Sequence, residues 1–580
     1  MNFTKRTSII MAIAIMIVFG CSDDDTEQLP QASADFTFTI DFLTVSFINE
    51  SPSDASEFLW DLGNGTTTPV ENPTVTYEAF GTYTVTLVVN NGEGFITKAV
   101  SVAPPMEDAS TFSEIESLSI GGEGAAEISA YDAVNERLFV VNNDGESTID
   151  VIDFSNPSAL SVDSSIGISS FGDGVNSVAV SDLYLAAAIE ANQATDPGVV
   201  VVWALDDLSM PVAEVTVGSL PDMVTFTSDG NFILVANEGE PDDDYLTDPE
   251  GSVSIIDTED FTAKLLDFNN FNSTETDLGQ LGFRVFGPGA TLAQDVEPEY
   301  IAVSPDNSTA YVALQENNGL AVVDLMSQSI TAIIPLGLKD YSIEGNEIDP
   351  SDEDDAYNPI SVPALGMYQP DGIAAYEVDG QVYIISANEG DAREYEGTPG
   401  FIGEDRVRDI ALDPAAFPDA ASLQEDENLG RLKLTITNGN FNNDEDFDEI
   451  WSYGARSFSV WNGSTGELVW DSGNELEVQA NMAGIYDDGR SDDKGVEPEG
   501  AIVGYVSGIP IGFIGLERVD AVAVYDLSDP TSPEFLAILE TGDAPEGLVF
   551  IDAAHSPTQK SLLVVSSEDD GTVKVYETQN

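Results

Sequence analysis

Short runs of alternating apolar and polar residues fill the chain from about residue 32 to residue 103. Examples are DFTF (35–38), LTVSF (43–47) and YTVTLVV (83–89). Alternation with a period of two is typical of β-strands that bury one face. The pattern predicts a small β-sandwich, with Trp60 as one of its core residues.

A longer pattern of strands repeats through the rest of the chain. Each unit has a small turn, two strands joined by a turn, a loop, and a third strand that ends near Asp; the repeats are clearest at 220–260, 297–327 and 544–577. Similar openings occur near Gly124, Val175, Gln369 and Glu497. Units of three or four short strands cannot bury both faces alone, so they stack radially as propeller blades. The fold class is therefore predicted to be all-β, with a seven-bladed propeller after the sandwich.

Two irregular segments bear on the number of blades. The stretch 456–473 resembles an eighth unit but has no opening strand pair, so we interpret it as the outer hairpin of the fifth blade, displaced by an insertion at about 391–450. The seventh unit stops at its third strand, 572–577, and a lone strand at 112–120 precedes the first unit. We expect this lone strand to complete the seventh blade and close the ring. An eight-bladed propeller is the alternative.

Acidic residues recur where these strands begin and end. The second strand of a blade runs back beside the first, so the start of the first and the end of the second share one face. The first strands begin at Glu127, Asn176, Asp222, Glu299, Asp371, Glu499 and Glu546. The second strands end at Asn143, Glu190, Glu238, Glu316, Glu389, Glu517 and Glu568. Carboxylates gathered round one opening need counter-charge, protonation or solvent. In the alternative, they cap strand ends.

Hard cations with oxygen ligands suit such an opening, because Ca²⁺ takes about six to eight oxygens from carboxylates, carbonyls and water. We therefore predict Ca²⁺ as a cofactor, with these ligands at the opening: Glu238, Glu389, Asp391, Glu499, Glu517 and Glu568. The stretch TNGNFNNDEDFDEI (437–450) also resembles the start of a D-x-[DN]-x-[DN]-G calcium loop, without its glycine. Its candidate ligands are Asn440, Asn442, Asp444 and Asp448. The alternative for this stretch is a solvated acidic loop.

The charge balance excludes some classes of function. The 18 Lys and Arg residues against 105 Asp and Glu give a net charge of −87, which excludes nucleic-acid binding by a basic surface. One Cys and one His leave no disulfide within the chain, no cysteine zinc site and no His-paired nucleophile. We expect His555 to lie in a turn on the face opposite the carboxylates, without a role.

Half of the basic residues, nine of 18, fall between Arg393 and Arg518. Arginine beside carboxylates and metal is an arrangement that binds phosphate or carboxylate ligands. Arg393, Arg490 and Arg518 are accordingly the candidates for anion binding. The alternative is that they neutralise the acidic opening through ion pairs.

The N-terminus has the features of an export signal. Lys5 and Arg6 precede an apolar run at 9–19 that is too short to span a membrane comfortably. The run ends in VFGC, which resembles the lipobox of bacterial lipoproteins and implies a signal peptide at 1–21 with lipidation of Cys21. The acidic tether at 22–31 begins SDDD, similar to the surface-export signal of Bacteroidetes lipoproteins. These resemblances imply a surface-exposed protein held in the outer membrane by lipid; an ordinary cleaved signal is the alternative.

Further motifs resemble known families. WDLGNG (60–65) with Pro73 and Tyr77 resembles a PKD domain, an immunoglobulin-like sandwich, here at 32–103 with a linker at 104–111. NEGDAREYEG (388–397) and GRSDDKGVEPEG (489–500) resemble the choice-of-anchor I domain, here a propeller at 112–580. That family includes mesenchyme-specific cell-surface glycoproteins, and its members are often labelled alkaline phosphatase. The EPEG turn (497–500) is also similar to turns of phytase-like and lactonase-like propellers, whose calcium lies at the channel mouth.

Two functions follow as hypotheses. The first is a lipid-anchored, calcium-stabilised propeller that acts as a binding or adhesion module for an extracellular glycan, protein or anionic small molecule. The alternative is a calcium-dependent hydrolase of phosphomonoesters or lactones, in which the metal polarises the ester and generates hydroxide. The sequence assigns no catalytic residue, and it leaves open whether the protein is an enzyme.

Overall fold

The computed structural model describes residues 34–579, apart from 42, 54, 78, 93, 103–105, 354, 355, 396 and 443. The chain divides into two compact units, 1–105 and 106–580. The expected signal peptide, its Cys21 and the acidic tether lie outside the described residues. Within the described residues, none of the helices has the length and apolar character that crossing a bilayer requires.

The first unit contains a two-sheet β-sandwich. One sheet has the order β1-β2-β5 and the other β4-β3-β6-β7. The strands are β1 (Phe36–Asp41), β2 (Thr44–Asn49), β3 (Phe58–Asp61), β4 (Thr67–Thr68), β5 (Thr74–Thr76), β6 (Gly81–Val89) and β7 (Gly94–Val102). Trp60 is fully buried in the apolar core between the sheets, as predicted. The Tyr77 hydroxyl donates to the Leu62 carbonyl oxygen at 2.8 Å, which fixes the loop after β3.

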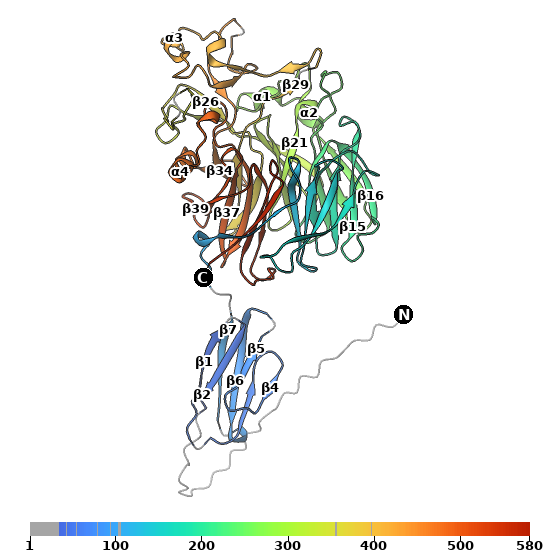
Figure 1. The fold of residues 1–580 in the computed structure, drawn as a ribbon, viewed down its shortest axis with the longest axis vertical. Helices are drawn as coiled ribbons and strands as arrows, with labels where there is room; N and C mark the ends of the chain where they lie inside the picture. The colour runs from blue at the N-terminus through green and yellow to red at the C-terminus, as the bar shows by residue number, and fades with distance from the viewer. Residues whose placement is uncertain are drawn as a thin grey trace, which may run out of the picture. The chain divides into compact units, whose positions relative to one another are not determined.

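The second unit is a seven-bladed β-propeller, which confirms the predicted fold class (Figure 1). Each blade is a four-stranded antiparallel sheet. Strands are given from the channel outward. Blade 1 has β9 (Ala125–Asp132), β10 (Arg137–Asn142), β11 (Thr148–Asp153) and β12 (Ser161–Gly167), and blade 2 has β13 (Val175–Val180), β14 (Tyr184–Ile189), β15 (Pro197–Ala204) and β16 (Ala213–Ser219). Blade 3 has β17 (Pro221–Phe226), β18 (Phe232–Asn237), β19 (Ser252–Asp257) and β20 (Ala263–Asp267), and blade 4 has β21 (Pro298–Val303), β22 (Thr309–Leu314), β23 (Gly319–Asp324) and β24 (Ser329–Pro335).

The fifth and seventh blades have the unusual connections that the sequence suggests. Blade 5 has β27 (Ile373–Val378), β28 (Gln381–Asn388), β34 (Ser457–Asn462) and β35 (Leu468–Asp471). Blade 6 has β36 (Pro498–Val506), β37 (Ile509–Leu516), β38 (Ala521–Asp526) and β39 (Glu534–Glu540). Blade 7 has β40 (Pro545–Ile551), β41 (Leu562–Ser567), β42 (Thr572–Glu577) and β8 (Ser113–Ser119). The hairpin β34–β35 is thus the outer half of blade 5, and β8 pairs with β42 to close the ring. The alternative of eight blades is wrong.

Apolar side chains between neighbouring blades hold the ring together. Each of the seven junctions has its own buried cluster; at the junction of blades 3 and 4, for example, Leu234 and Val253 pack with Ile301 and Val312. The second strands are buried along almost their whole length, as in the run Leu185–Ile189 of β14. Strands buried on both faces have nearly continuous apolar sequences, and this is the origin of the repeats.

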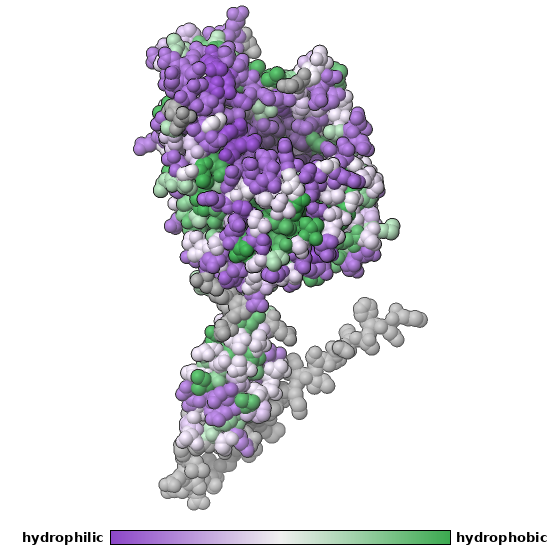
Figure 2. Space-filling model, viewed as in Figure 1, coloured by the Kyte–Doolittle hydropathy of each residue, from purple (hydrophilic) through white to green (hydrophobic). Residues whose placement is uncertain are grey.

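The long connections gather at one end of the propeller, where the second strands end and the first strands begin. In Figure 1, α1, α2, α3, β26 and β29 all lie at this end, and hydrophilic side chains dominate its surface (Figure 2). Its elements are α1 (Glu275–Gly279), α2 (Leu292–Asp295), β25 (Leu338–Asp340), β26 (Leu365–Met367), β29 (Glu394–Tyr395), β30 (Phe401–Ile402), β31 (Glu404–Arg406), α3 (Ala420–Leu423), β32 (Lys433–Thr435), β33 (Trp451–Ser452) and α4 (Glu475–Ala483).

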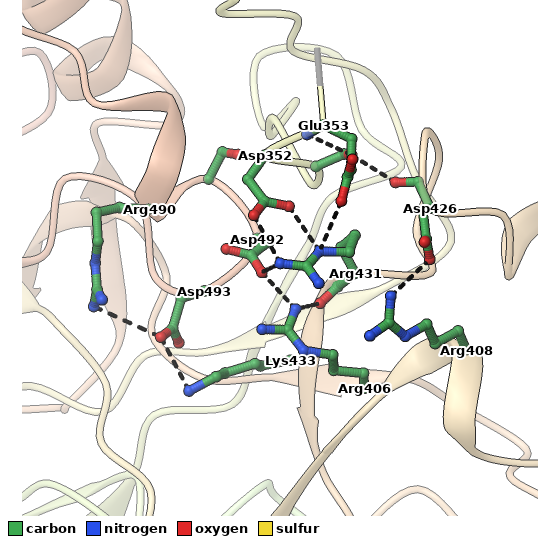
Figure 3. Close-up of polar contacts among 12 residues, drawn as sticks. Asp352, Glu353, Arg406, Arg408, Asp426, Arg431, Lys433, Arg490, Asp492 and Asp493 are labelled. Carbon is green, nitrogen blue, oxygen red and sulfur yellow. Dashed lines mark hydrogen bonds and ion pairs between the residues drawn. The ribbon is translucent and has the colours of Figure 1, made fainter. Parts of the chain in front are cut away.

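Ion pairs fasten the insertion of blade 5 to neighbouring loops (Figure 3). Arg431 pairs with Asp352 at 2.7 Å and with Asp492 at 3.1 Å. Lys433 pairs with Asp493 at 3.1 Å. These contacts join the insertion to the loops before β26 and before β36. Several basic residues of this region therefore serve the protein's own architecture.

Candidate functional site

The propeller has a central channel of about 1270 Å³, and residues from both ends of the propeller line it. At the end with the long connections its lining includes Asp222, Glu299, Asp371, Glu499 and Glu546, all from first strands or the residues just before them. At the other end its lining includes turns between first and second strands, among them the turn with His555. His555 lies opposite the carboxylates, as expected, and its ring contacts Asp552 at 2.7 Å.

A local irregularity positions the acidic residue at the start of several first strands. β17, β21, β36 and β40 each begin with Pro, and each has a register shift just after it. The residue before the Pro has a left-handed backbone at Leu220, Glu497 and Ala544, with φ between +46° and +56°. A β-bulge bends the strand and re-aims a side chain. We interpret this geometry as the cause that points the acidic residue after each Pro toward the channel.

The acidic residues converge into one cluster, which we call the acidic mouth. Its members are Glu127, Asp222, Glu238, Glu299, Glu316, Asp371, Glu389, Glu499, Glu517, Glu546 and Glu568. Burial raises the pKa of every one, and repulsion from other acidic residues adds to the shift. Glu190 stands apart: its pKa is raised by burial and by Asp173, outside the mouth.

The pKa shifts show how closely the mouth is packed. Burial raises the pKa of Glu127 to about 7, with Glu568 and Asp222 contributing. Burial likewise raises the pKa of Asp222 to about 7 and that of Glu517 to about 8. For Glu499, burial and then Glu517 place the pKa well above its ordinary value. A proton or a cation placed among carboxyls in this state stabilises them, because it reduces their mutual repulsion.

Two groups of three carboxylates have the spacing of a cation site. Oxygens of Asp371, Glu389 and Glu499 lie within 4.8 Å of one another, as do oxygens of Glu389, Glu497 and Glu517. Lys494 lies between the groups and pairs with Glu389 at 2.8 Å and with Glu497 at 3.1 Å. The second group has further cations of its own, so the group Asp371–Glu389–Glu499 is the better candidate for a metal.

The remaining cations at the mouth are also paired with carboxylates. Arg518 pairs with Glu517 at 2.8 Å and with Glu497 at 3.4 Å. Arg490 pairs with Glu497 and, at 3.6 Å, with Asp493. Both side chains keep about a third of their surface exposed, at 32% for Arg490 and 37% for Arg518. The alternative role of these arginines, to neutralise the mouth, fits this geometry.

Arg393, a candidate for anion binding, is paired with carboxylates of this chain, which fits the alternative of neutralisation; its binding of an external anion stays a prediction. Its side chain is only 2% exposed and pairs with Asp295 at 2.9 Å and with Glu297 at 2.5 Å. Its guanidinium also lies over the ring of Phe286. The acidic partners come from α2 and from the residue before β21, which sequence reasoning did not connect with Arg393. Its charge therefore offsets buried carboxylates of this chain.

The predicted calcium loop at 437–450 lies between β32 and β33. Its side chains bond mainly within the loop: Asp448 accepts from the Phe441 amide at 2.9 Å, and Asp444 accepts from the Asp446 amide at 3.1 Å. Asn440 donates to the Asp444 carbonyl at 2.9 Å, and Asn442 lies 3.5 Å from an Asp448 oxygen. Metal binding by these residues stays a prediction. Asp391, the remaining predicted ligand, is 53% exposed and lies 3.8 Å from Lys494.

Sequence reasoning placed Asp371 at the acidic opening but not among the predicted metal ligands, and it omitted Glu297, Glu497 and Lys494 from the site. A signal for the first three was present, since Glu297, Glu497 and Asp371 all belong to the X-Pro-acid openings of blades. The residue before the Pro is itself acidic in two of these openings and reaches the mouth. No comparable pattern marks Lys494, because its loop is specific to one blade connection.

The fold and the site define a β-propeller with an acidic channel mouth, joined to a PKD-like sandwich. Residues 127–530 match the model of the choice-of-anchor I domain family, and residues 30–103 match a PKD domain model. The chain belongs to the choice-of-anchor I domain family.

Two curated proteins are similar to parts of this chain. Gigasin-3a of Magallana gigas is 31% identical over 189 residues, which are 27% of this chain and 66% of that protein. The mesenchyme-specific cell surface glycoprotein of Strongylocentrotus purpuratus is 29% identical over 342 residues, 52% of this chain and 42% of that protein. This chain thus spans less than two thirds of either relative.

Among solved structures, hydrazine synthase of Kuenenia stuttgartiensis aligns with a TM-score of 0.43 at 13% identity, over 80% of this chain and 97% of that one. The Cps50 (Swd1) β-propeller domain of Myceliophteria thermophila aligns with a TM-score of 0.41 at 8% identity, over 81% of this chain and 100% of that one.

Proposed function

We propose that this protein is a cell-surface binding module whose ligand meets the propeller at the acidic mouth, where a calcium ion is bound. The observation that carries the proposal is the convergence of carboxylates from neighbouring blades on one opening, with only a few paired cations among them. The name of the sea-urchin relative, a mesenchyme-specific cell surface glycoprotein, supports the surface location.

The group Asp371, Glu389 and Glu499 is the proposed calcium site. Its carboxylates come from blades 5 and 6, so a bound cation bridges two blades. Gln315 donates to one oxygen of Glu389 at 2.9 Å and Lys494 to the other at 2.8 Å, which orients this side chain. One oxygen of Glu499 is buried without a hydrogen-bond partner among the described residues. A cation at this point satisfies that oxygen.

A calcium ion held by three carboxylates retains positions for oxygens of a ligand, because Ca²⁺ takes about six to eight ligand oxygens. Hydroxyl groups of a glycan or carboxylates of a protein or small molecule are oxygen ligands of this kind. The excess of negative charge at the mouth makes binding of an anion dependent on the metal. We therefore expect ligand binding that requires calcium.

Lipidation of Cys21 is the proposed means of attachment to the outer membrane. Its support is the sequence alone, since Cys21 is the one cysteine of the chain and ends the apolar run at 9–19. Mass spectrometry of protein extracted from membranes tests it: we expect a lipid-modified N-terminal Cys21. A chain that starts at another residue, or an unmodified Cys21, contradicts it.

The hydrolase alternative has less support from the site. Each of the three arginines proposed for an anion is paired with carboxylates of the protein. Turnover of p-nitrophenyl phosphate, phytate or lactones that depends on calcium is the result that would favour the hydrolase.

Calorimetric titration of the metal-free full chain with CaCl₂ tests the proposed site. We expect binding that Asp371→Asn and Glu499→Gln weaken at least tenfold. Glu190→Gln is the control, because Glu190 follows the second strand of blade 2, as Glu389 follows that of blade 5, but lies outside the mouth; it should bind as the wild type does. Unchanged calcium binding in both mouth variants would reject the site.

A further inference from the structure

The connection between blades 5 and 6 carries charged side chains into the acidic mouth. It spans residues 484–497, between α4 and β36, and we call it the mouth loop. Arg490, Lys494 and Glu497 of this loop reach the mouth. The Lys494 side chain is only 12% exposed, and its ammonium group contacts Glu389 at 2.8 Å and Glu497 at 3.1 Å. Lys494 is therefore a fixed positive charge inside the mouth.

Lys494 contacts a carboxylate of the proposed calcium site. Glu389 belongs to the group Asp371, Glu389 and Glu499, and one of its oxygens is the nearest carboxylate oxygen to Lys494. An ammonium group and a divalent cation repel each other, and the repulsion is strong where burial lowers the dielectric constant. Gln315 donates to the other oxygen of Glu389 at 2.9 Å, so Glu389 keeps one orienting contact when Lys494 is absent. Lys494 should therefore lower the affinity of this site for calcium.

Basic residues from the insertion of blade 5 bind the two residues that precede Lys494 in the mouth loop (Figure 3). Arg431 pairs with Asp492 at 3.1 Å, and Lys433 pairs with Asp493 at 3.1 Å. Arg431 and Lys433 lie at the start of β32, which pairs with β31. A lysine side chain is long and flexible, so anchors next to it in the chain reduce the number of positions open to its ammonium group.

The main chain of the mouth loop is bound at the same point. The Lys433 amide donates to the Asp492 carbonyl at 3.0 Å. Arg456, which precedes β34, donates to the Ser491 carbonyl at 2.7 Å and to the Asp493 carbonyl at 2.9 Å. The Arg456 side chain is only 2% exposed, so this contact is part of the core of the connection. The position of the next residue in the loop is therefore set from both the insertion and blade 5.

We propose that the insertion positions Lys494 against Glu389 through Asp492 and Asp493, and that Lys494 competes there with calcium. This inference rests on the proposed calcium site between blades 5 and 6. The basic residues of the insertion are positioning residues, because they act on the site through Lys494. The insertion thereby sets the calcium concentration at which the mouth is occupied. If its ion pairs were only structural, breaking them would weaken calcium binding or leave it unchanged, whereas release of a competitor strengthens it.

Calorimetric titration of the metal-free full chain with CaCl₂ measures the competition. Lys494→Met should tighten calcium binding at least tenfold, because it removes the competing charge. Arg431→Gln and Lys433→Gln should each tighten it at least threefold, because each frees the mouth loop from one ion pair. Lys433→Arg keeps the charge and should bind calcium as the wild type does. Arg408→Gln is the matched control and should also bind as the wild type does, because Arg408 belongs to the same insertion but pairs with Asp426.

Amine labelling of the metal-free protein measures the position of Lys494 without calcium. Reductive methylation followed by mass spectrometry gives the rate at which Lys494 reacts. We expect the same slow rate in the wild type and in Arg408→Gln, and a rate at least threefold higher in Arg431→Gln and Lys433→Gln. Lys98 of the sandwich is 33% exposed and is the internal standard, which should react equally in all the proteins. Equal rates for Lys494 in all the proteins would overturn the inference.

The outcomes separate this inference from the proposed function. Calcium binding that Asp371→Asn weakens, but that Lys494→Met also weakens or leaves unchanged, overturns the inference and leaves the calcium site standing. Calcium binding that Asp371→Asn does not change rejects the calcium site and the competition with it, and the labelling rates still decide whether the insertion positions Lys494. If Lys494→Met does not fold, Arg431→Gln and Lys433→Gln give the same decision, because these side chains are already 20% and 26% exposed.

Discussion

The two ends of the propeller use the same residue type in opposite ways. At the end with short turns, Asp229 accepts from the Thr227 hydroxyl at 2.7 Å and from the Asn231 amide at 3.1 Å, and these bonds lower its pKa. Asp306 does the same in the next blade. At the acidic mouth, burial and repulsion raise the pKa of Glu299 and Asp371 instead.

The difference lies in the range of the contacts. A turn aspartate finds its donors within two residues of the chain, so its charge is satisfied by local structure. A carboxylate at the mouth meets carboxylates from other blades, which are distant in sequence and equally in need of donors. Acidic residues are therefore structural at one end and form the proposed cation-binding surface at the other.

Removal of Lys494 should have the largest effect on stability. Its side chain is 12% exposed and pairs with Glu389 and Glu497, so Lys494→Met leaves buried carboxylates without their cation. Loss of one partner of a buried ion pair costs about 3–5 kcal/mol. Urea unfolding measures this free energy. Lys574→Met is the control, because Lys574 pairs with the more exposed Glu114, and it should cost about 1 kcal/mol or less. Equal losses in both variants would contradict the comparison.

Removal of a carboxylate should change the free energy of unfolding in opposite directions at the two ends. In EDTA, Glu499→Gln relieves repulsion in the mouth and should raise the free energy of unfolding, whereas Asp229→Ala removes two hydrogen bonds from a turn and should lower it by about 1 kcal/mol. Thermal and urea unfolding of both variants check this. A loss of stability in Glu499→Gln would show that the mouth carboxylates are satisfied within the protein.

The pH dependence of stability should follow the mouth. Glu127 and Asp222 have pKa values of about 7, above their ordinary values, so the folded state holds their protons to higher pH than the unfolded state does. Their contribution is present at low pH and is lost as the pH rises through 7. The free energy of unfolding in EDTA should therefore be lower at pH 8 than at pH 5.5. Calcium should restore stability mainly at pH 8, and equal stabilisation at both values would contradict this account.

Much of this organisation could be predicted from the sequence. The repeats determine the blades, the place of the hairpin at 457–471 and the closure by residues 113–119, because each repeat must bury its apolar strands against a neighbour. The gathering of acidic residues at one end could also be predicted, because antiparallel strands bring the start of each first strand and the end of each second strand to the same face. The ion pairs of Arg393 were not predictable, since Asp295 and Glu297 are about a hundred residues away in the chain. Lys494 comes from a loop whose path depends on the insertion.

The most direct test of the central claim is the anomalous diffraction of a crystal soaked in terbium, which replaces calcium at oxygen sites. The account predicts a peak between Asp371, Glu389 and Glu499, and none at the turns of Asp229 and Asp306. Peaks confined to the surface turns, with the channel mouth bare, would contradict it.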